Sequence, residues 1–499
     1  MSKTLRNIIY VFGAATLSKF IGLFTLFLIA RILEPENYGI WIALLLIISY
    51  APIIALGTVE TLLKQFPYYA GRGELVKAKE IEDCVLGSIT LSAIFLIIAG
   101  FNFHLILKIE ELQFSLQMIR TMVVAASLSL FSAYFYYRFA AHQNFKTYSI
   151  IDTTRSISNF IVLVTFTWLW GLKGAVFGFC LIELVICILS AFLSNSLCGK
   201  VGVNFNLKLI WETIKIGFPI TVIWWIYMVQ TTAGNIISIS MLGKTETGYY
   251  GLGGSIVSVL ILIPMAIGQV LYPKISEGLG KSLEKNDMAL FVITPARTLS
   301  LILPIAIGVL ILMSPAIYHM LFPKYVSGLL SAQVLLLGAF FICLVRTGAN
   351  YLIANGEQNR LIKYVAISLV TVITANISFI KLGLNIEGIA LGTAFSGALF
   401  TTLIWKTVFK GFGYDRIGQL KEIFNLYAPF LLLIGLIGFF VLAVPDLLID
   451  TSFLPMICMV IFILLFILIT LFVPPFNKTS REIYDLIKLH IPSRMNHRA

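Results

Sequence analysis

The sequence is poor in charged residues, and this deficit excludes an ordinary soluble protein. Of its 499 residues, 59% are hydrophobic and only 12% are charged, whereas soluble domains carry about 25% charged residues. A net charge of +12 would by itself suggest a nucleic-acid-binding protein. However, the basic residues lie in short segments between apolar runs and form no continuous basic face. We therefore expect no nucleic-acid partner and a chain that mostly faces lipid.

Residues that hold metals or form disulfides are also scarce. The six cysteines lie in or beside apolar runs, and none belongs to a CxxC motif, which is typical of cysteines that only fill apolar space. The five histidines are scattered, and the sequence has no cluster of His and carboxylate residues at metal-ligand spacing. We therefore expect neither a metal nor a cofactor.

A cleavable signal peptide is not expected at the start of the sequence. Lys3 and Arg6 precede an apolar stretch, as in a signal peptide, but Lys19 interrupts it. No small-residue cleavage site follows before Arg31. We interpret this stretch as an uncleaved first membrane helix.

Long apolar runs dominate the remainder of the sequence. A membrane-spanning helix needs about 20 mostly apolar residues, and backbone groups in hydrocarbon must bond within the helix. The sequence predicts an all-α polytopic membrane protein with about fourteen spans. They lie near 8–30, 39–63, 83–104, 113–137, 148–170, 174–195, 215–239, 249–272, 291–313, 329–353, 361–380, 385–405, 425–444 and 453–473.

The loops predict the orientation of the chain. With the N-terminus placed in the cytoplasm, each inside segment carries at least two Lys or Arg residues. The predicted outside loops carry at most one each: Arg31, Lys108, Lys173, Lys244, Lys324 and Lys381. This alternation is a strong positive-inside signal. It predicts a multi-pass protein of the bacterial cytoplasmic (inner) membrane with both termini in the cytoplasm.

Two similar turns indicate an internal repeat. Leu33–Gly39 joins the first two spans, and Leu242–Gly248 joins the seventh and eighth. Each following span ends in an aromatic-Pro pair, Phe66-Pro67 or Tyr272-Pro273. Six spans separate the copies, so both have the same orientation, as in one class of transporter repeats. The predicted domains are a six-helix lobe (1–200), a second six-helix lobe (201–410), two added spans (411–475) and a basic cytoplasmic tail (476–499).

Several of these segments resemble a known family. The stretch from Gly13 to Gly39, with the pattern Leu33-x-Pro-x-x-Tyr-Gly-x-Trp41, resembles the opening of bacterial polysaccharide-biosynthesis (Wzx-like) flippases. The segments Leu321–Tyr325 and Asn355–Arg360 are similar to loops of that family. These flippases belong to the multidrug/oligosaccharidyl-lipid/polysaccharide exporter (MOP) superfamily, which implies a MATE-like fold.

The resemblance also implies a substrate. Flippases of this family export polyprenyl-pyrophosphate-linked oligosaccharides from the inner to the outer leaflet. The product is then used for O-antigen, capsule, exopolysaccharide or another polymer. A polysaccharide polymerase and glycosyltransferases are the protein partners expected beside the lipid-linked substrate and membrane lipid.

Basic residues inside the predicted spans are the first candidates for a substrate site. Each costs about 2.5–3.5 kcal/mol at the centre of a membrane helix, so it should face water, a partner or a substrate. The planar fork of arginine matches phosphate oxygens. We therefore predict a cationic cavity for the pyrophosphate; snorkelling or a buried ion pair is the alternative for each residue. The candidates are Lys19, Arg120, Arg155, Arg297 and Arg346, with Asn350 four residues after Arg346.

The acidic residues inside spans are fewer and are candidates for coupling. They are Glu60, Asp152 and Glu183. Glu183 is positioned to pair with Lys19 in an empty cavity, or to bind a coupling proton or sodium ion. The alternative for Glu60 is a local pair with Lys64, and the alternative for Asp152 is a local pair with Arg155.

A stripe of aromatic and polar residues runs along the predicted helix 215–239. Aromatic rings stack on the CH faces of sugars, and amides bond to their hydroxyls, so the stripe suits an oligosaccharide. Ordinary helix–helix packing is the alternative. The stripe comprises Trp224, Tyr227, Thr231, Asn235 and Ser238.

Two other classes of function compete with a flippase. A membrane glycan polymerase or transferase needs acid–base or metal groups in a sizeable extramembrane loop, and the predicted outside loops are short. A multidrug cation exporter of the same superfamily should have an acidic cavity and twelve spans, whereas this chain has more bases than acids in its spans. The sequence therefore favours a transporter of an anionic, lipid-linked sugar and disfavours an enzyme.

Overall fold

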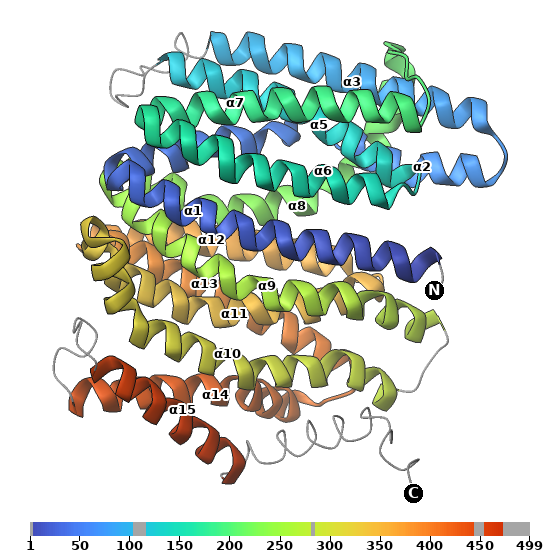
Figure 1. Ribbon diagram of the computed structural model, residues 1–499. Coiled ribbons are helices and arrows are strands. Elements are labelled where there is room, and N and C mark those ends of the chain that lie inside the picture. The colour runs from blue at the N-terminus through green and yellow to red at the C-terminus, as the bar shows by residue number, and fades with distance from the viewer. Residues whose placement is uncertain (1–2, 103–115, 281–284, 444–453, 473–499) are drawn as a thin grey trace, which may run out of the picture. The chain divides into compact units, whose positions relative to one another are not determined.

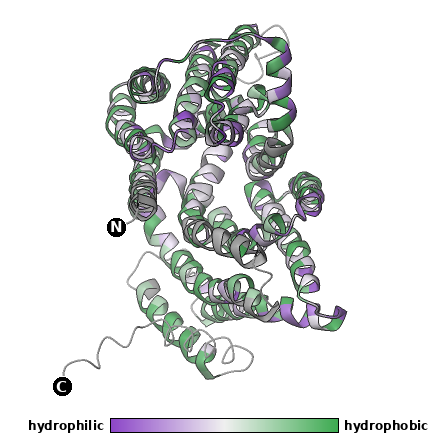
Figure 2. Ribbon diagram, turned by 90° about the vertical axis from the view of Figure 1, so that its right-hand side faces the viewer, coloured by the Kyte–Doolittle hydropathy of each residue, from purple (hydrophilic) through white to green (hydrophobic). Residues whose placement is uncertain are grey.

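The structure of the protein is a computed structural model that describes residues 3–102, 116–280, 285–443 and 454–472 (Figure 1). All regular secondary structure in these ranges is helical. Nine of the described segments are long and apolar enough to cross a membrane, and two of them, Leu17–Ala55 and Phe145–Leu197, cover two predicted spans each. Hydrophobic residues cover most of the helical ribbon (Figure 2). The predicted all-α polytopic fold is confirmed, whereas the predicted tail at 476–499 lies outside the described residues.

The chain divides into two compact units, Met1–Gly251 and Leu252–Ala499. The elements of the first unit are α1 (Lys3–Tyr50), η1 (Ala51–Ala55), α2 (Thr58–Gly71), α3 (Leu75–Phe101), α5 (Leu116–Ala141), α6 (Phe145–Ser158), η3 (Asn159–Leu163), α7 (Val164–Leu197) and α8 (Leu207–Met241). Helix α9 (Lys244–Gly280) begins in this unit. The second unit continues with α10 (Lys285–Leu321), η4 (Pro323–Gly328), α11 (Leu329–Ala354), α12 (Gln358–Lys381), α13 (Asn385–Gly411), α14 (Arg416–Ala443) and α15 (Leu454–Phe472).

Two pairs of consecutive predicted spans meet at a sharp break inside a helix in place of a loop: the first and second within α1, and the fifth and sixth within α7. In α1 the break is at Glu34, whose φ of 63° and ψ of 166° are not helical, and Pro35 follows it. In α7 the break is at Trp170 and Gly171, and Gly171 has a φ of 59°, a conformation that glycine adopts without steric cost. With these breaks counted, each of the fourteen predicted spans is largely helical in its described residues, but the span 39–63 is itself interrupted at Leu56 and Gly57, which adopt left-handed conformations between η1 and α2.

The first unit is built around the packing of α5 against α3 and α7. Tyr134 and Phe139 of α5 are fully buried, and the Tyr134 hydroxyl donates to the Glu82 carbonyl of α3 at 3.1 Å. Large apolar side chains on the outer faces are exposed, including Trp168 at 72%. Such exposure is expected where the solvent is lipid rather than water.

The two turns predicted as an internal repeat lie against each other within the first unit. A Cβ atom added at Gly39 would collide with the Lys244 carbonyl oxygen, and one added at Gly248 would collide with the Pro35 carbonyl oxygen. Lys244 Nζ also lies 3.7 Å from Glu36 Oε1. The contact is reciprocal, and it depends on the absence of a side chain at both glycines.

A second backbone contact of this kind joins α2 to α8. A Cβ at Gly217 would collide with the Gly57 carbonyl oxygen, and Thr61 Oγ1 donates to the Thr213 carbonyl at 2.7 Å. Small residues allow membrane helices to approach this closely. We call the two glycine contacts together the glycine seam: Gly39 of α1 with Gly248 of α9, and Gly57 at the start of α2 with Gly217 of α8.

The second unit is dominated by the packing of α13 against α11 and α12. The Trp405 indole N–H donates to the Leu344 carbonyl at 3.1 Å, and the hydroxyls of Ser368 and Ser396 lie 2.9 Å apart. Thr401 Oγ1 donates to the Phe341 carbonyl at 2.8 Å. These interhelical hydrogen bonds satisfy polar side chains that are buried within the bundle.

Candidate functional site

Arg155, one of the predicted membrane cations, is paired with a buried carboxylate. Arg155 Nη2 of α6 lies 3.5 Å from Glu183 Oε2 of α7, and the side chains are 32% and 4% exposed. Among the described ion pairs, neither of the alternatives considered, Arg155 with Asp152 or Glu183 with Lys19, is present. The reason is the packing of α6 against α7, which places Glu183 next to Arg155. A partner that is distant in sequence therefore takes the place of the sequence neighbour Asp152.

Arg297 has a closely bound partner in the second unit. Its Nη2 on α10 donates to Glu422 Oε2 of α14 at 2.7 Å. The side chains are 19% and 14% exposed, so this pair is largely shielded from solvent. Glu422 lies outside the spans predicted from sequence and was not a candidate, although its position one turn before an apolar run was a usable signal.

Arg346 and Arg120 hold a buried guanidinium nitrogen without a hydrogen-bond partner. In Arg346 of α11 and in Arg120 of α5 this atom is Nε. The Arg120 guanidinium lies over the Phe101 ring, 5.4 Å from its centroid. An unbonded buried donor is costly, so these two arginines retain the capacity to bind an acceptor such as a phosphate oxygen.

Lys19 and Glu60 occupy different surroundings. The Lys19 side chain is exposed on α1, and a Cβ at nearby Gly22 would meet no atom within 4 Å. Glu60 is half-buried on α2, whereas Lys64 is exposed. Among the ion pairs of the described residues, none joins Glu60 to Lys64, so the predicted local pair is wrong.

The remaining predicted site residues are only partly described. The side chains of Trp224 and Tyr227 on α8 lie outside the described residues. Asn235 on the same helix has a buried Oδ1 atom without a hydrogen-bond partner. Asp152 on α6 and Asn350 on α11 are half-buried. In the described ranges, no three His, Cys, Asp or Glu side chains gather as a metal site.

The most extensive polar network of the first unit was not predicted. At its centre, Arg138 of α5 binds Glu82 of α3 through two hydrogen bonds. The Nε–Oε1 distance is 2.6 Å and the Nη2–Oε2 distance is 3.1 Å. The side chains are 0% and 1% exposed. The predicted span 113–137 ends just before Arg138, whereas α5 continues to Ala141 and buries this side chain.

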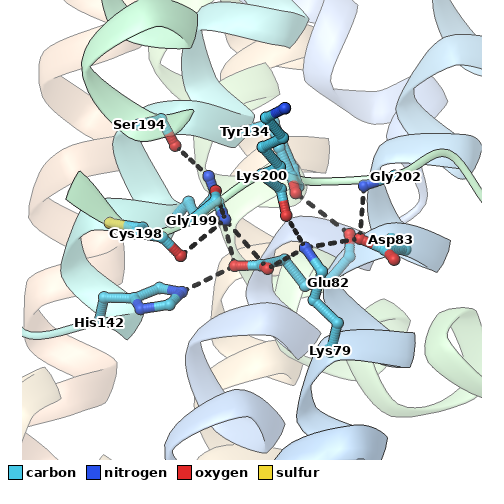
Figure 3. Close-up of polar contacts among 11 residues, drawn as sticks. Lys79, Glu82, Asp83, Tyr134, His142, Ser194, Cys198, Gly199, Lys200 and Gly202 are labelled. Carbon is cyan, nitrogen blue, oxygen red and sulfur yellow. Dashed lines mark hydrogen bonds and ion pairs between the residues drawn. The ribbon is translucent and has the colours of Figure 1, made fainter. Parts of the chain in front are cut away.

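Other side chains complete this network, which we call the Glu82 hub. His142 Nε2 lies 2.8 Å from Glu82 Oε1, and the His142 ring contacts the Phe66 ring at 4.1 Å between centroids. Lys79 Nζ donates to Glu82 Oε2 at 3.1 Å. Figure 3 shows Glu82 between His142 and Lys79, with Ser194, Cys198 and Gly199 around it.

The hub also binds the segment that follows α7. Arg138 Nη1 donates to Ser194 Oγ at 2.5 Å, and Nη2 donates to the carbonyls of Cys198 and Gly199 at 3.2 and 2.8 Å. Burial raises the pKa of the Cys198 thiol above its ordinary value. One guanidinium therefore connects α3, α5, α7 and the segment beyond it.

Each unit has arginines within its membrane helices: Arg120 and Arg155 in the first, and Arg297 and Arg346 in the second. Described carboxylate partners are Glu183 for Arg155 and Glu422 for Arg297. A guanidinium held by one carboxylate can exchange that partner for a phosphate, since both present oxygens to the same planar fork. The arrangement suits the binding of an anion. It does not provide the nucleophile, base and orienting group that an enzyme site requires.

Comparisons with known proteins agree with this architecture. A family model described as "Polysaccharide biosynthesis protein" matches residues 4–279, more than half of the chain. A comparison with curated protein sequences finds no match.

Several solved structures have a similar fold. The lipid II flippase MurJ in an inward closed conformation has a TM-score of 0.71 at 17% identity, over 96% of this chain and 100% of that chain. An inward-facing MATE-family multidrug transporter of the MOP superfamily has a TM-score of 0.63 at 11% identity, covering 82% and 95%. A mutant of the Vibrio cholerae MATE transporter VcmN has a TM-score of 0.54 at 13% identity, covering 83% and 99%. The predicted MATE-like fold is confirmed.

Proposed function

This chain belongs to the polysaccharide biosynthesis protein family, and from that premise we propose that it flips a polyprenyl-pyrophosphate-linked oligosaccharide from the inner to the outer leaflet of the bacterial cytoplasmic membrane. The family and the fold are those of membrane transporters of the MOP superfamily rather than of an enzyme. Both termini are proposed to lie in the cytoplasm, in agreement with the distribution of Lys and Arg among the loops.

The observation that carries the substrate proposal is the state of the membrane arginines. Arg346 has a buried Nε without a partner, and Arg155 and Arg297 each have a described carboxylate partner on another helix. A pyrophosphate cannot cross hydrocarbon bare, because desolvating its charges costs many kcal/mol. Each of these arginines offers donors that replace water around a phosphate while the polyprenyl chain stays in lipid.

The proposed driving force is the membrane potential itself. An inside-negative potential favours outward movement of an anion by about 2.3 kcal/mol per charge per 100 mV. Two headgroup charges would gain roughly twice that amount at the same potential. Glu183 and Glu60 are the proposed sites if a coupling proton or sodium ion is also used.

A cation exporter of the same superfamily is the competing function, because solved multidrug transporters share the fold. An exporter of organic cations would place carboxylates toward its substrate. In the pair that Arg155 forms with Glu183, however, the carboxylate is the more deeply buried partner, 4% exposed against 32% for the arginine. The more accessible group of that pair is the cation, which favours an anionic substrate.

The decisive experiment compares two substrates in vesicles that contain the purified protein. We expect export of a fluorescent lipid-linked oligosaccharide and no uptake of a cationic dye. Arg346→Gln should reduce export at least tenfold, because the headgroup loses a charged donor, whereas Arg360→Gln should leave it unchanged. Arg360 is exposed and bonds only to Glu357 on its own turn. Transport of the dye without transport of the lipid would replace this proposal with the cation exporter.

A further inference from the structure

The segment between α7 and α8, residues 198–206, has no regular secondary structure but is bound to α3 along most of its length. We call it the strap. Gly202 N donates to Asp83 Oδ1 at 2.8 Å, and Asn204 N donates to the Asp83 carbonyl at 3.0 Å. Lys79 Nζ donates to the Lys200 carbonyl. Figure 3 shows Gly202 beside Asp83 and Lys200 near Lys79.

The strap is held most firmly at its beginning, where Arg138 donates to two consecutive carbonyls, those of Cys198 and Gly199. The same guanidinium is fixed on its other side by Glu82. Near the other end, a Cβ at Gly87 of α3 would collide with the Asn204 carbonyl oxygen. The docking therefore extends from Cys198 to Asn204.

Helix α8 starts immediately beyond the last of these contacts. The Asn206 side chain caps the helix by accepting from the N–H groups of Lys208 and Leu209 at 3.1 and 3.3 Å. Phe205, which lies between Asn204 and this cap, is 51% exposed. The chain thus passes from a fixed strap to an independently capped helix within two residues.

We propose that Glu82 and Arg138 are positioning residues for transport, which hold the strap on α3 and thereby place the pivot of α8 at Phe205 and Asn206. This inference rests on the proposed function, since it assigns a role in the transport movement. A free strap of nine residues could absorb a displacement of about 30 Å, whereas two residues absorb only about 7 Å. With the strap docked on α3, the connection is too short to absorb a movement of α8 relative to α3.

Stability alone does not account for this arrangement. A buried ion pair often contributes no more than well-packed apolar residues of the same volume. Yet Arg138, with 0% exposure, uses Nε and both Nη atoms on three separate segments of the chain: α3, α7 and the strap. The buried guanidinium instead holds two backbone carbonyls of the strap, which lie outside regular secondary structure.

The first test measures amide hydrogen exchange of the strap in lipid nanodiscs, without any substrate. Wild-type protein should exchange slowly at Gly202 and Asn204 and faster at Phe205. Arg138→Lys keeps the charge but cannot reach Glu82 and both carbonyls at once. It should speed exchange across residues 199–204 at least tenfold, whereas the control Arg360→Lys should not. Unchanged exchange of the strap in Arg138→Lys would overturn the proposal.

The second test restores docking by a covalent route. Gly202 lies against Asp83, since a Cβ at Gly202 would be 3.4 Å from Asp83 Cγ, which is compatible with disulfide geometry. In a variant whose native cysteines are replaced, Asp83→Cys and Gly202→Cys are combined with Arg138→Lys. We expect oxidation of this pair to return strap exchange to a slow rate and to recover export, and reduction to reverse both effects.

Export in the second test is read as a maximal rate and a half-saturating concentration. Arg138→Lys should lower the maximal rate at least tenfold and leave the half-saturating concentration unchanged, since a positioning residue does not touch the substrate. Slow export despite an oxidised, slowly exchanging strap would overturn the positioning role. If the wild-type protein moves no lipid-linked oligosaccharide, the proposed function fails. The exchange measurements still decide whether Arg138 holds the strap on α3.

Discussion

At the scale of single residues, the charge types in the spans were predictable and their partners were not. The cost of a bare charge in lipid identified Arg155 and Arg297 as residues that need compensation. Their described partners, Glu183 and Glu422, come from other helices. The spacing rule for a helix identifies only partners three or four residues apart. It therefore cannot identify an ion pair between two helices.

The Arg155–Glu183 pair leads to a prediction that separates stability from transport. Arg155→Gln should lower the stability of the protein by about 1–3 kcal/mol, because it leaves a buried carboxylate without its partner. The double variant Arg155→Gln with Glu183→Gln should recover most of that loss but not the export rate. Melting temperatures in detergent and export in vesicles provide the two readouts. Recovery of export in the double variant would show that Arg155 serves only to neutralise Glu183.

The Cys198 thiol gives a prediction about pH. Burial raises its pKa, and the thiolate is the form that reacts with maleimides. In a variant with Cys198 as its single cysteine, labelling at pH 7 should be slower than for an exposed cysteine and should increase with pH to values above the ordinary thiol pKa. Adding Arg138→Lys should speed labelling by exposing the strap. A rate equal to that of free cysteine at pH 7 would contradict this expectation.

At the scale of elements, apolar length predicted the spans, but not the way in which they join. The sequence placed a loop at Leu33–Gly39, and the structure has a single broken helix there, with the break at Glu34. Likewise, Arg138 follows an apolar run and was placed in a loop, although α5 carries it into the core. Hydropathy measures transfer into lipid. Hydropathy therefore cannot reveal that a polar end of a helix, such as that of α5, is buried against other helices of the protein.

The glycine seam predicts opposite effects for its two glycine contacts. Gly39→Ala should force the turns of α1 and α9 apart, because its Cβ would collide with the Lys244 carbonyl oxygen. Gly217→Ala should separate α8 from α2 in the same way. The matched control is Gly22→Ala, because a Cβ at Gly22 would meet no atom within 4 Å.

The readout for the seam is a single cysteine at Thr232, which lies on α8 between Gly217 and the turn that leads to Gly248 and bonds to Tyr50 at 2.7 Å. With a membrane-impermeant maleimide, Gly39→Ala should speed its labelling from outside. Gly217→Ala should speed its labelling from the cytoplasm, and Gly22→Ala should change neither rate. Equal labelling from both sides in all three variants would show that the seam does not control access.

At the scale of the whole molecule, composition alone predicted the class of protein. A chain that is 59% hydrophobic and 12% charged has too few charges to be soluble and too many apolar runs to be anything but polytopic. The family match confirmed the polysaccharide biosynthesis assignment. The Glu82 hub stayed invisible at this scale, because its residues come from α3, α5 and the strap, and only the folded chain unites them.

The charge of the proposed substrate predicts how transport depends on the membrane. Collapsing the potential with valinomycin and potassium, while keeping the pH gradient, should slow export in vesicles, since the headgroup carries negative charge outward. Collapsing the pH gradient alone should have little effect. The opposite pattern would assign the driving force to protons and direct attention to Glu183 and Glu60.

The helix breaks at Glu34 and Gly171 carry a practical consequence. Each joins two spans without an intervening loop, so these turns offer almost no flexible chain to a protease or an antibody on the predicted outer face. A peptide tag inserted at either position would have to unwind helix on both sides. Surface digestion of intact cells should therefore spare both sites, and topology reporters belong elsewhere in the chain.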